Sequence, residues 1–330
     1  MASIMTNASA LTALQSLNAT QKNLDTTQAR ISTGYRVSQA SDNAAYWSIA
    51  TTMRSDNQAM STVSDSLGLG ASKVDTAYTG MNSAIDTINK IQQKLTASYG
   101  QTDASKEKTQ TEIKALQDQL KAYADGATFS GTNMLSVSTA SGTTADVKIV
   151  SAFNRSATGT VSISTIDVNV DSIKLYDAGA APTNKGILDA NYVGATGAIV
   201  GTAQNPTLGA AAAAGDTYSV ATLKIFDSAT SKGASDSQIS EMMNVVDTAL
   251  KAMTTAATKL GAAKSSIDLQ KTFTQSLMDS IDRGVGQLVD ADMNKESTRL
   301  QALQVQQQLG VQALSIANSS SQSILSLFRG

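Results

Sequence analysis

The sequence predicts a mainly α-helical protein, in which a long antiparallel coiled-coil-like helical bundle from both chain ends carries a small β-rich central insert domain. Three observations predict this fold. Apolar residues recur every seven positions through both flanks of the chain. Residues 127–235 hold eleven of the 22 glycines and both prolines. The same central region contains short stretches in which apolar and polar residues alternate, as in half-exposed strands.

The two ends of the chain predict terminal helices of similar length, residues 4–31 and 300–328. Both are poor in charge, and their apolar stripes are narrow, with Gln307, Gly310 and Ser321 interrupting the second. A solitary helix pair with such seams is marginal in water. We therefore expect neighbouring copies of the chain to complete them. The residues to which we assign this polymerisation are Ile4, Leu11, Leu14, Leu17, Leu24, Leu300, Leu303, Leu314, Ile324 and Phe328.

A stop and restart follows the first helix. Gly34 is predicted to end that helix in a left-handed conformation, and Ser41 or Asp42 is predicted to cap the next one. The residues assigned to this layer junction and to contacts between subunits are Gly34, Arg36, Asp42, Asn43, Tyr46 and Trp47. Arg36 and Asp42 are expected to pair across subunits. For Tyr46 and Trp47 two readings stay open: burial at the junction, or a subunit contact.

Two long helices carry the heptad repeats and are expected to pack along one another, because each has an apolar stripe that must leave water. The first stripe is Met53, Met60, Leu67, Val74, Met81, Ile88 and Leu95. The second is Ile239, Val246, Met253, Leu260, Ile267, Thr274, Ile281 and Leu288, with Thr274 as its polar member. A shorter helix over residues 104–125 offers Ile113, Leu116, Leu120 and Tyr123 to the same bundle.

The central region predicts short strands. Alternation favours strands at 161–164, 166–170, 218–220 and 223–225, and the alanine run 210–214 is read as a loop or short helix. These elements divide the chain into three predicted parts. They are terminal helices at 1–34 and 300–330, a helical rod domain at 35–126 and 236–299, and a variable, surface-exposed β-rich domain at 127–235.

Composition excludes most catalytic and binding chemistry. The chain has neither histidine nor cysteine, so it cannot form Cys/His metal sites, a Ser-His-Asp triad or a disulfide framework. Charged residues make up 16% and the net charge is −2, so a nucleic-acid partner is not expected. No apolar run is long enough to span a membrane, so no membrane insertion is expected. We predict no enzyme activity, no cofactor and no metal.

The motifs at both ends resemble one known family. Ile31-Ser32-Thr33-Gly34-Tyr35-Arg36-Val37, followed by Ala40-Ser41-Asp42-Asn43-Ala44-Ala45, is similar to the signature of bacterial flagellins, the subunits of the flagellar filament. Phe129 to Leu135, Leu260 to Ala263, and Asp290-Ala291-Asp292-Met293 through Gln308 to Ser326-Leu327 are similar too. Together these segments cover about two thirds of the chain.

The resemblance implies a function and a set of partners. It implies an extracellular filament for swimming, made of this chain and sibling flagellins, with an inner tube of terminal helices and an outer tube of rods. It also implies an export chaperone on the C-terminal helix, the flagellar type III export apparatus, a filament cap and hook-associated proteins. Export by that route requires no cleaved signal peptide, which fits the absence of a basic n-region after Met1.

The sequence departs from the family in segments that immune receptors read. Over residues 30–50, Asn43 replaces a usual acidic residue, and Tyr46 and Trp47 replace a small-then-aliphatic pair. Near residues 90–98 the chain has lysine where many members have arginine. We expect weak recognition by innate immune receptors.

Two alternatives remain at this stage. A hook–filament junction protein would share the terminal helices, but would join the tube in few copies. An enzyme in the central domain would have to use carboxylate or Ser-Lys chemistry, because histidine and cysteine are absent. The sequence does not distinguish glycosylated Ser and Thr in the central domain from an ordinary polar loop.

Overall fold

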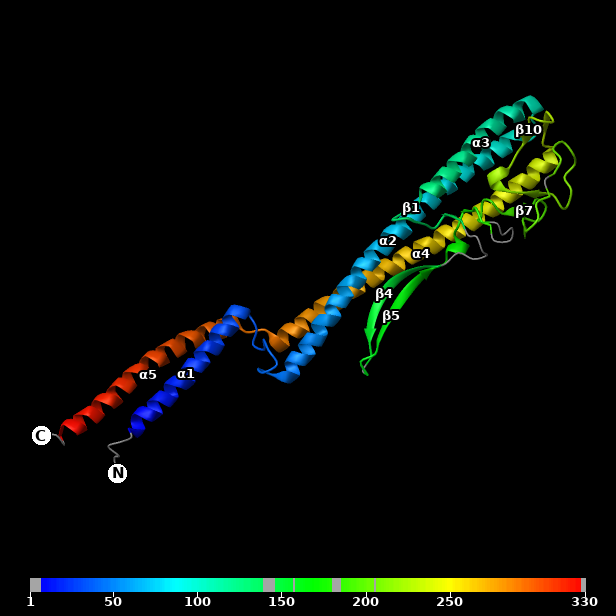
Figure 1. Ribbon diagram of the computed structural model, residues 1–330. Coiled ribbons are helices and arrows are strands. Elements are labelled where there is room, and N and C mark those ends of the chain that lie inside the picture. The colour runs from blue at the N-terminus through cyan, green and yellow to red at the C-terminus, as the bar shows by residue number, and fades with distance from the viewer. Residues whose placement is uncertain (1–6, 139–145, 157, 180–184, 205, 328–330) are drawn as a thin grey trace. The chain divides into compact units, whose positions relative to one another are not determined.

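A computed structural model describes residues 7–138, 146–156, 158–179, 185–204 and 206–327, with side chains described as far as residue 319. The described chain is mainly helical with a small β-rich insert (Figure 1), and the predicted fold class is confirmed. It divides into two compact units, residues 1–59 with 277–330 and residues 60–276. No helix of the described chain is long and apolar enough to cross a membrane.

Five helices account for most of the described residues. Their bounds are α1 Ala8–Thr33, α2 Ala44–Ser98, α3 Asp103–Gly126, α4 Asp236–Val289 and α5 Met293–Leu327. The long helices predicted from the heptads correspond to α2 and α4, and the predicted short helix corresponds to α3. The last predicted helix begins earlier than expected, at Met293, because Asp292 caps it: the Asp292 Oδ1 accepts the N–H groups of Asn294 and Lys295 at 3.0 and 3.2 Å.

In the unit formed by residues 60–276, α2 and α4 run antiparallel. The Lys264 ammonium pairs with Asp75, and Thr96 Oγ1 lies 3.5 Å from Met243 Sδ, so a step forward along α2 is matched by an equal step back along α4. Heptad residues fill the space between the helices. The buried ones are Met60, Leu67, Val74, Met81, Ile88, Leu95, Ile239, Val246, Met253, Leu260, Ile267 and Thr274. From α3, Ile113 and Leu120 are buried in the same core, while Leu116 and Tyr123 are half-buried.

The central insert is built from short strands and loops. Its bounds are β1 Thr128–Phe129, β2 Thr132–Asn133, β3 Ser136–Val137, β4 Val147–Arg155, β5 Val161–Val168, η1 Val170–Ser172, β6 Tyr176–Asp177, β7 Asn191–Val193, β8 Ile199–Val200, β9 Thr217–Tyr218, η2 Val220–Thr222, β10 Phe226–Asp227 and β11 Lys232–Gly233. The longest pairing is the antiparallel hairpin of β4 and β5, whose register shifts between Val150 and Ala152. Parallel pairing joins β3 to β6.

The structure corrects part of the strand prediction. The segments predicted at 161–164 and 166–170 share one strand, β5, which ends at Val168, while Val170 begins η1. Of residues 218–220 only Tyr218 lies in a strand, and residues 223–225 form no strand. Ile225 is held instead by a side chain, because its N–H donates to Gln110 Oε1 at 2.6 Å. Residues 210–214 form a loop without helix, in keeping with one of the two readings.

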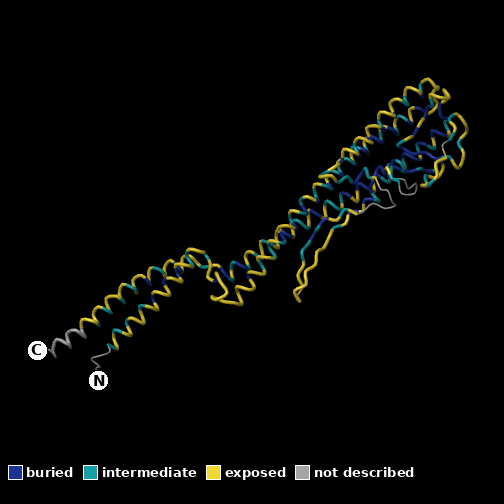
Figure 2. Tube along the Cα trace, in the orientation of Figure 1, coloured by how far each residue is buried: buried dark blue, intermediate teal, exposed yellow. Residues whose placement is uncertain are grey.

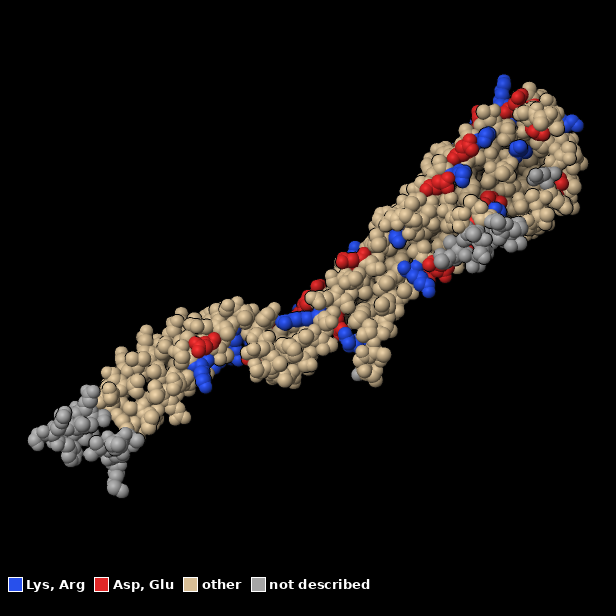
Figure 3. Space-filling view, viewed as in Figure 1, with Lys and Arg blue, Asp and Glu red and all other residues tan. Residues whose placement is uncertain are grey.

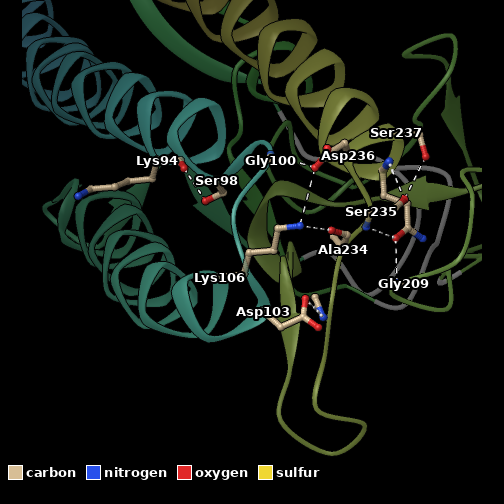
Figure 4. A network of polar contacts seen from close by, with 12 residues as sticks. Lys94, Ser98, Gly100, Asp103, Lys106, Gly209, Ala234, Ser235, Asp236 and Ser237 are labelled. Atoms are coloured by element: carbon tan, nitrogen blue, oxygen red, sulfur yellow. Dashed lines mark hydrogen bonds and ion pairs between the residues drawn. The ribbon is translucent and has the colours of Figure 1, made fainter.

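Polar side chains of α3 hold the last part of the insert by its backbone. The Gln117 amide donates to the carbonyl oxygens of Val220 and Leu223 at 2.8 and 3.1 Å. The Lys106 ammonium donates to Ala234 O at 2.7 Å, and its Nζ lies 3.8 Å from Asp236 Oδ1 (Figure 4). These contacts satisfy backbone groups that sheet pairing would satisfy elsewhere. The irregular segment before α4 is therefore ordered without long strands.

Candidate polymerisation surface

The first part of the candidate surface is a pair of terminal helices with defined ends. Asn7 Oδ1 accepts the Ala10 N–H at 3.1 Å and caps α1 at its start. Gly34 ends α1 with φ +75°, and its N–H donates to Arg30 O at 2.8 Å. Glycine adopts this left-handed conformation without the steric cost that a Cβ would bring. The conformation predicted for Gly34 is confirmed.

Three polar contacts fix α1 against α5 in antiparallel register. The Asn7 amide donates to Ala317 O at 2.9 Å, and the Gln307 amide donates to Gln21 Oε1 at 2.8 Å. Arg30 pairs with Glu296 at 3.2 Å. The Glu296 side chain is buried, and its Oε2 has no partner among the described residues.

The α1 side of this seam consists largely of small and polar residues. Apart from Arg30, its buried and half-buried positions recur at alternating intervals of three and four: Ala10, Ala13, Leu17, Thr20, Leu24, Thr27 and Ile31. Thr20 and Thr27 are 5% and 1% exposed. A Cβ on Gly310 would lie 3.2 Å from Leu17 Cδ1, so the helices approach closely there. Sequence analysis missed Thr20, Thr27 and Glu296 because they are polar, although the first two share a three-four spacing with Leu24.

The predicted polymerisation residues fall into three groups. Leu24 and Leu303 are buried in the seam, and Leu17, Leu300 and Leu314 are half-buried. Leu11 and Leu14 are exposed, at 59% and 44%. Ile4 and Phe328 lie outside the described residues, as does the side chain of Ile324.

Exposed apolar side chains lie on the outward faces of both terminal helices. On α5 they are Val305, Leu309, Val311 and Ile316, each more than half exposed. Figure 2 shows how much of α1 and α5 is exposed, and the visible face in Figure 3 carries few charges along these helices. From residue 300 to 328 the sequence contains no charged residue. A helix pair with this surface gains from further burial, because fully burying a leucine is worth about 1.5–3 kcal/mol.

Beyond Gly34, the connecting segments at the two ends of the chain hydrogen-bond to each other. Tyr35 and Asp290 form an isolated antiparallel bridge, and the Arg36 N–H donates to Val289 O at 2.6 Å. The Arg36 guanidinium donates to Leu288 O at 2.8 Å. Its positive charge interacts favourably with the last carbonyl groups of α4, which have no partner within the helix. Below this bridge lies a small core of Val37, Ala50, Val285 and Val289, with Met53, Ile281 and Leu288 half-buried against it.

The structure corrects the predicted cap of α2. Asn43 Oδ1 accepts the Tyr46 N–H at 3.1 Å, so Asn43 is the cap. Asp42 turns back instead and accepts the N–H groups of Ser38 and Gln39 at 3.0 and 3.1 Å. These backbone hydrogen bonds lower the pKa of Asp42 below its usual value of 3.8. Both Asp42 and Arg36 therefore have partners within the chain.

The aromatic pair of α2 is accessible. Tyr46 is 42% exposed and Trp47 is 39% exposed. Tyr35 nearby is stacked by Arg54, whose guanidinium carbon lies 4.7 Å from the ring centroid. Of the two readings left open for Tyr46 and Trp47, exposure favours a contact with a partner.

In the described part of the chain no group of three or more acidic side chains is arranged to hold a metal ion. The terminal helices instead combine a close-packed seam with apolar outward faces. This arrangement is suited to association between helices.

Comparison with known proteins identifies the family. The model for the bacterial flagellin N-terminal helical region matches residues 4–140, and that for the bacterial flagellin C-terminal helical region matches residues 243–328. The chain belongs to the bacterial flagellin family. It is 47% identical to a flagellin of Brucella melitensis over 330 residues and 49% identical to flagellin C of Rhizobium meliloti over 333 residues, in each case over the full length of both chains.

Flagellins are structural proteins, not enzymes. The two helical regions that define the family include α1 and α5, which form the seam and the outward apolar faces. Nothing in these comparisons favours the hook–filament junction protein.

Proposed function

We propose that this flagellin, a structural subunit of the flagellar filament, polymerises through the outward faces of α1 and α5. The observation that carries this proposal is the exposure of Leu11, Leu14, Leu309 and Ile316 on the uncharged stretches of these helices, residues 8–21 and 300–327. In each copy the seam between α1 and α5 is formed within the chain, so the outward faces are available to other copies. Contacts between different faces of successive copies produce an open helical filament when the rotation does not close.

In this proposal, the junction between the terminal helices and the long helices fixes the direction in which the chain leaves α1 and enters α5. The bridge between Tyr35 and Asp290 and the hydrogen bonds of Arg36 to the end of α4 hold the chain where α1 ends and α5 begins. Tyr46 and Trp47 then offer apolar surface to a neighbouring copy. The heptad residues of the two long helices form the core of the rod domain.

The finer partners are also proposals, and they rest on membership of the family. An export chaperone would cover the uncharged C-terminal part of α5 before assembly, and the type III export apparatus would carry the chain without a cleaved signal peptide. The filament cap and hook-associated proteins would contact the two ends of the polymer.

We further propose weak recognition by innate immune receptors, because Asn43, Tyr46 and Trp47 depart from the family pattern. A strong plant immune response to a peptide of residues 29–50 at nanomolar dose would contradict this.

Replacement of outward-facing leucines tests the polymerisation surface. Leu11→Ser and Leu309→Ser remove exposed apolar side chains, so the monomer should keep its helix content and melting temperature. Loss of about 1–2 kcal/mol per contact raises the critical concentration for assembly roughly five- to thirty-fold. Assembly is followed by sedimentation and negative-stain microscopy.

Leu69→Ser is the matched control, since Leu69 is a 48% exposed leucine on α2 outside the terminal helices. It should change the critical concentration less than either terminal variant. Unchanged assembly of both terminal variants would refute the proposed surface.

A further inference from the structure

The central domain contains two copies of one short sequence pattern. Val170-Asp171-Ser172-Ile173-Lys174-Leu175-Tyr176-Asp177 aligns without a gap with Val220-Ala221-Thr222-Leu223-Lys224-Ile225-Phe226-Asp227. Valine, lysine and aspartate recur at the first, fifth and eighth positions, and the apolar positions are filled by similar residues. Each copy ends a few residues before a Lys-Gly pair, at Lys185-Gly186 and Lys232-Gly233.

The two copies also share the same order of local elements. Each begins with a 3-10 turn and ends with a strand, and each follows closely after another strand: β5 precedes η1 and β6 in the first, and β9 precedes η2 and β10 in the second. The apolar positions are buried in both copies; these residues are Val170, Ile173, Leu175 and Tyr176, and Val220, Leu223, Ile225 and Phe226. Lys174 and Lys224 therefore hold equivalent sequence positions, but the backbone before them differs, with ψ −14° at Ile173 and 129° at Leu223.

In the first copy the lysine is enclosed by carboxylates. Lys174 is 1% exposed, and its ammonium donates to Asp177 Oδ2 at 2.8 Å and to Asp171 Oδ1 at 2.9 Å. Burial disfavours the ammonium, but the two carboxylates outweigh it and raise the pKa of Lys174. In the first copy, carboxylate oxygens thus accept the hydrogen bonds of the buried lysine.

The second copy lacks this arrangement. Ala221 stands where the first copy has Asp171. The Asp227 carboxylate accepts the Thr230 hydroxyl at 3.1 Å and the Ala229 N–H at 3.3 Å. Lys224 is exposed and makes no hydrogen bond or ion pair with the described residues. One carboxylate of the first copy therefore has no counterpart beside Lys224.

Lys224 lies instead at a cavity of about 430 Å³. The side chains of Asn191, Thr207 and Thr222 also line this cavity, and like Lys224 they make no side-chain hydrogen bond within the described chain. Leu208, which is half-buried, contributes apolar surface to it, whereas Met242 is only 1% exposed. The Asp227 carboxylate, which accepts the Thr230 hydroxyl and the Ala229 N–H, also lines the cavity. The cavity thus combines a cation, a carboxylate already hydrogen-bonded within the chain, uncharged polar groups and an apolar patch, the composition of a site for a small polar ligand.

We propose that this cavity binds a monosaccharide that carries a carboxylate, of the hexuronic acid class. The ligand carboxylate takes the place beside Lys224 that the Asp171 carboxylate takes beside Lys174. The sugar hydroxyls hydrogen-bond to Asn191, Thr207 and Thr222, and the C–H face of the ring packs on Leu208. The proposal concerns the central domain and is independent of polymerisation by the terminal helices.

Saturation-transfer difference NMR on the full-length protein tests this site, with sodium glucuronate as the probe. Wild-type protein should transfer saturation to the ring protons of glucuronate. Lys224→Met removes the charge but keeps much of the stem, and should weaken binding about tenfold, the effect of losing a hydrogen bond to a charged group. Ala221→Asp restores the carboxylate of the first copy and should weaken binding by competing for Lys224.

Lys232→Met is the matched control, because Lys232 is exposed in the same domain but does not line the cavity. It should bind glucuronate as the wild type does, and all variants should keep the wild-type melting temperature. No transfer to glucuronate in the wild type, equal transfer with Lys224→Met, or equal binding of glucose would each overturn the proposal. Displacement of glucuronate by equimolar inorganic phosphate would overturn the assignment to sugar acids.

Discussion

Asp189 has a carboxylate group whose charged form is disfavoured by burial. Its Oδ2 accepts the Asp177 N–H at 3.0 Å, while its Oδ1 is fully covered and has no partner among the described residues. Burial disfavours the charged form and raises the pKa of Asp189 above its usual value of 3.8. The folded protein therefore holds this proton more tightly than the unfolded chain does.

A pH dependence follows from that shift. The contribution of Asp189 to folding is largest when the carboxyl is protonated, and it is lost as pH rises from 3.8 through the raised pKa. Asp189→Asn keeps an acceptor without a charge, so it should flatten this part of the stability profile. At neutral pH it should raise the melting temperature by about 2–4 °C, the shift that corresponds to about 1 kcal/mol.

Thermal unfolding of monomeric protein, followed by circular dichroism across this pH range, measures the effect. Wild type and Asp189→Asn should converge at low pH and separate as pH rises. Parallel profiles would contradict the assignment of this dependence to Asp189.

At the scale of single elements, two glycines of α2 have opposite surroundings. Gly68 has open space where a Cβ would lie. At Gly70 a Cβ would lie 2.4 Å from Cγ2 of Ile149, a buried residue of β4. The β4–β5 hairpin therefore packs against the helix where glycine leaves room for it.

Replacing each of these two glycines with alanine distinguishes the gain in stability from helix propensity from the loss caused by overpacking. Gly68→Ala should raise the free energy of unfolding by about 1 kcal/mol, because alanine favours the helix. Gly70→Ala gains the same propensity but forces Ile149 to move, and overpacking costs about 1–3 kcal/mol. We expect a net loss of up to about 2 kcal/mol, measured by urea denaturation.

The double variant Gly70→Ala, Ile149→Ala tests the cause. Truncation of Ile149 alone should destabilise the domain, but the added methyl group should then occupy part of the cavity. The two changes should therefore be less damaging together than their separate effects predict. Strict additivity would show that Gly70 acts through something other than this contact.

At the scale of the whole molecule, the large core and the candidate polymerisation surface belong to different parts of the chain. The residues of the main hydrophobic core all lie between Val63 and Ile267, and the seam between α1 and α5 lies outside that range. Stability of the rod and capacity to polymerise should therefore be separable.

Removal of residues 1–30 or 305–330 tests this separation. Either truncated protein should remain a soluble helical monomer, with the melting temperature of its rod within a few degrees of the full-length value. Neither should form filaments at concentrations at which the full-length chain does. Filaments in negative-stain images of either truncated protein would contradict the assignment of polymerisation to the terminal helices.

The sequence alone determined the long helices, their heptad cores and the left-handed end of α1 at Gly34, because these features follow from periodicity and from local backbone preference. It also carried the family, through motifs at both ends. Tertiary structure decided which polar side chains are buried and which partners they contact. Thr20, Thr27 and Glu296 enter the seam, Lys106 and Gln117 hold distant backbone, and Asn43 rather than Asp42 caps α2. A buried polar group is stable only when a partner is in place. Thr20 finds its partner within α1, at Ser16 O. For Glu296, Lys106 and Gln117 the partner lies far away along the chain, where no local pattern can specify it.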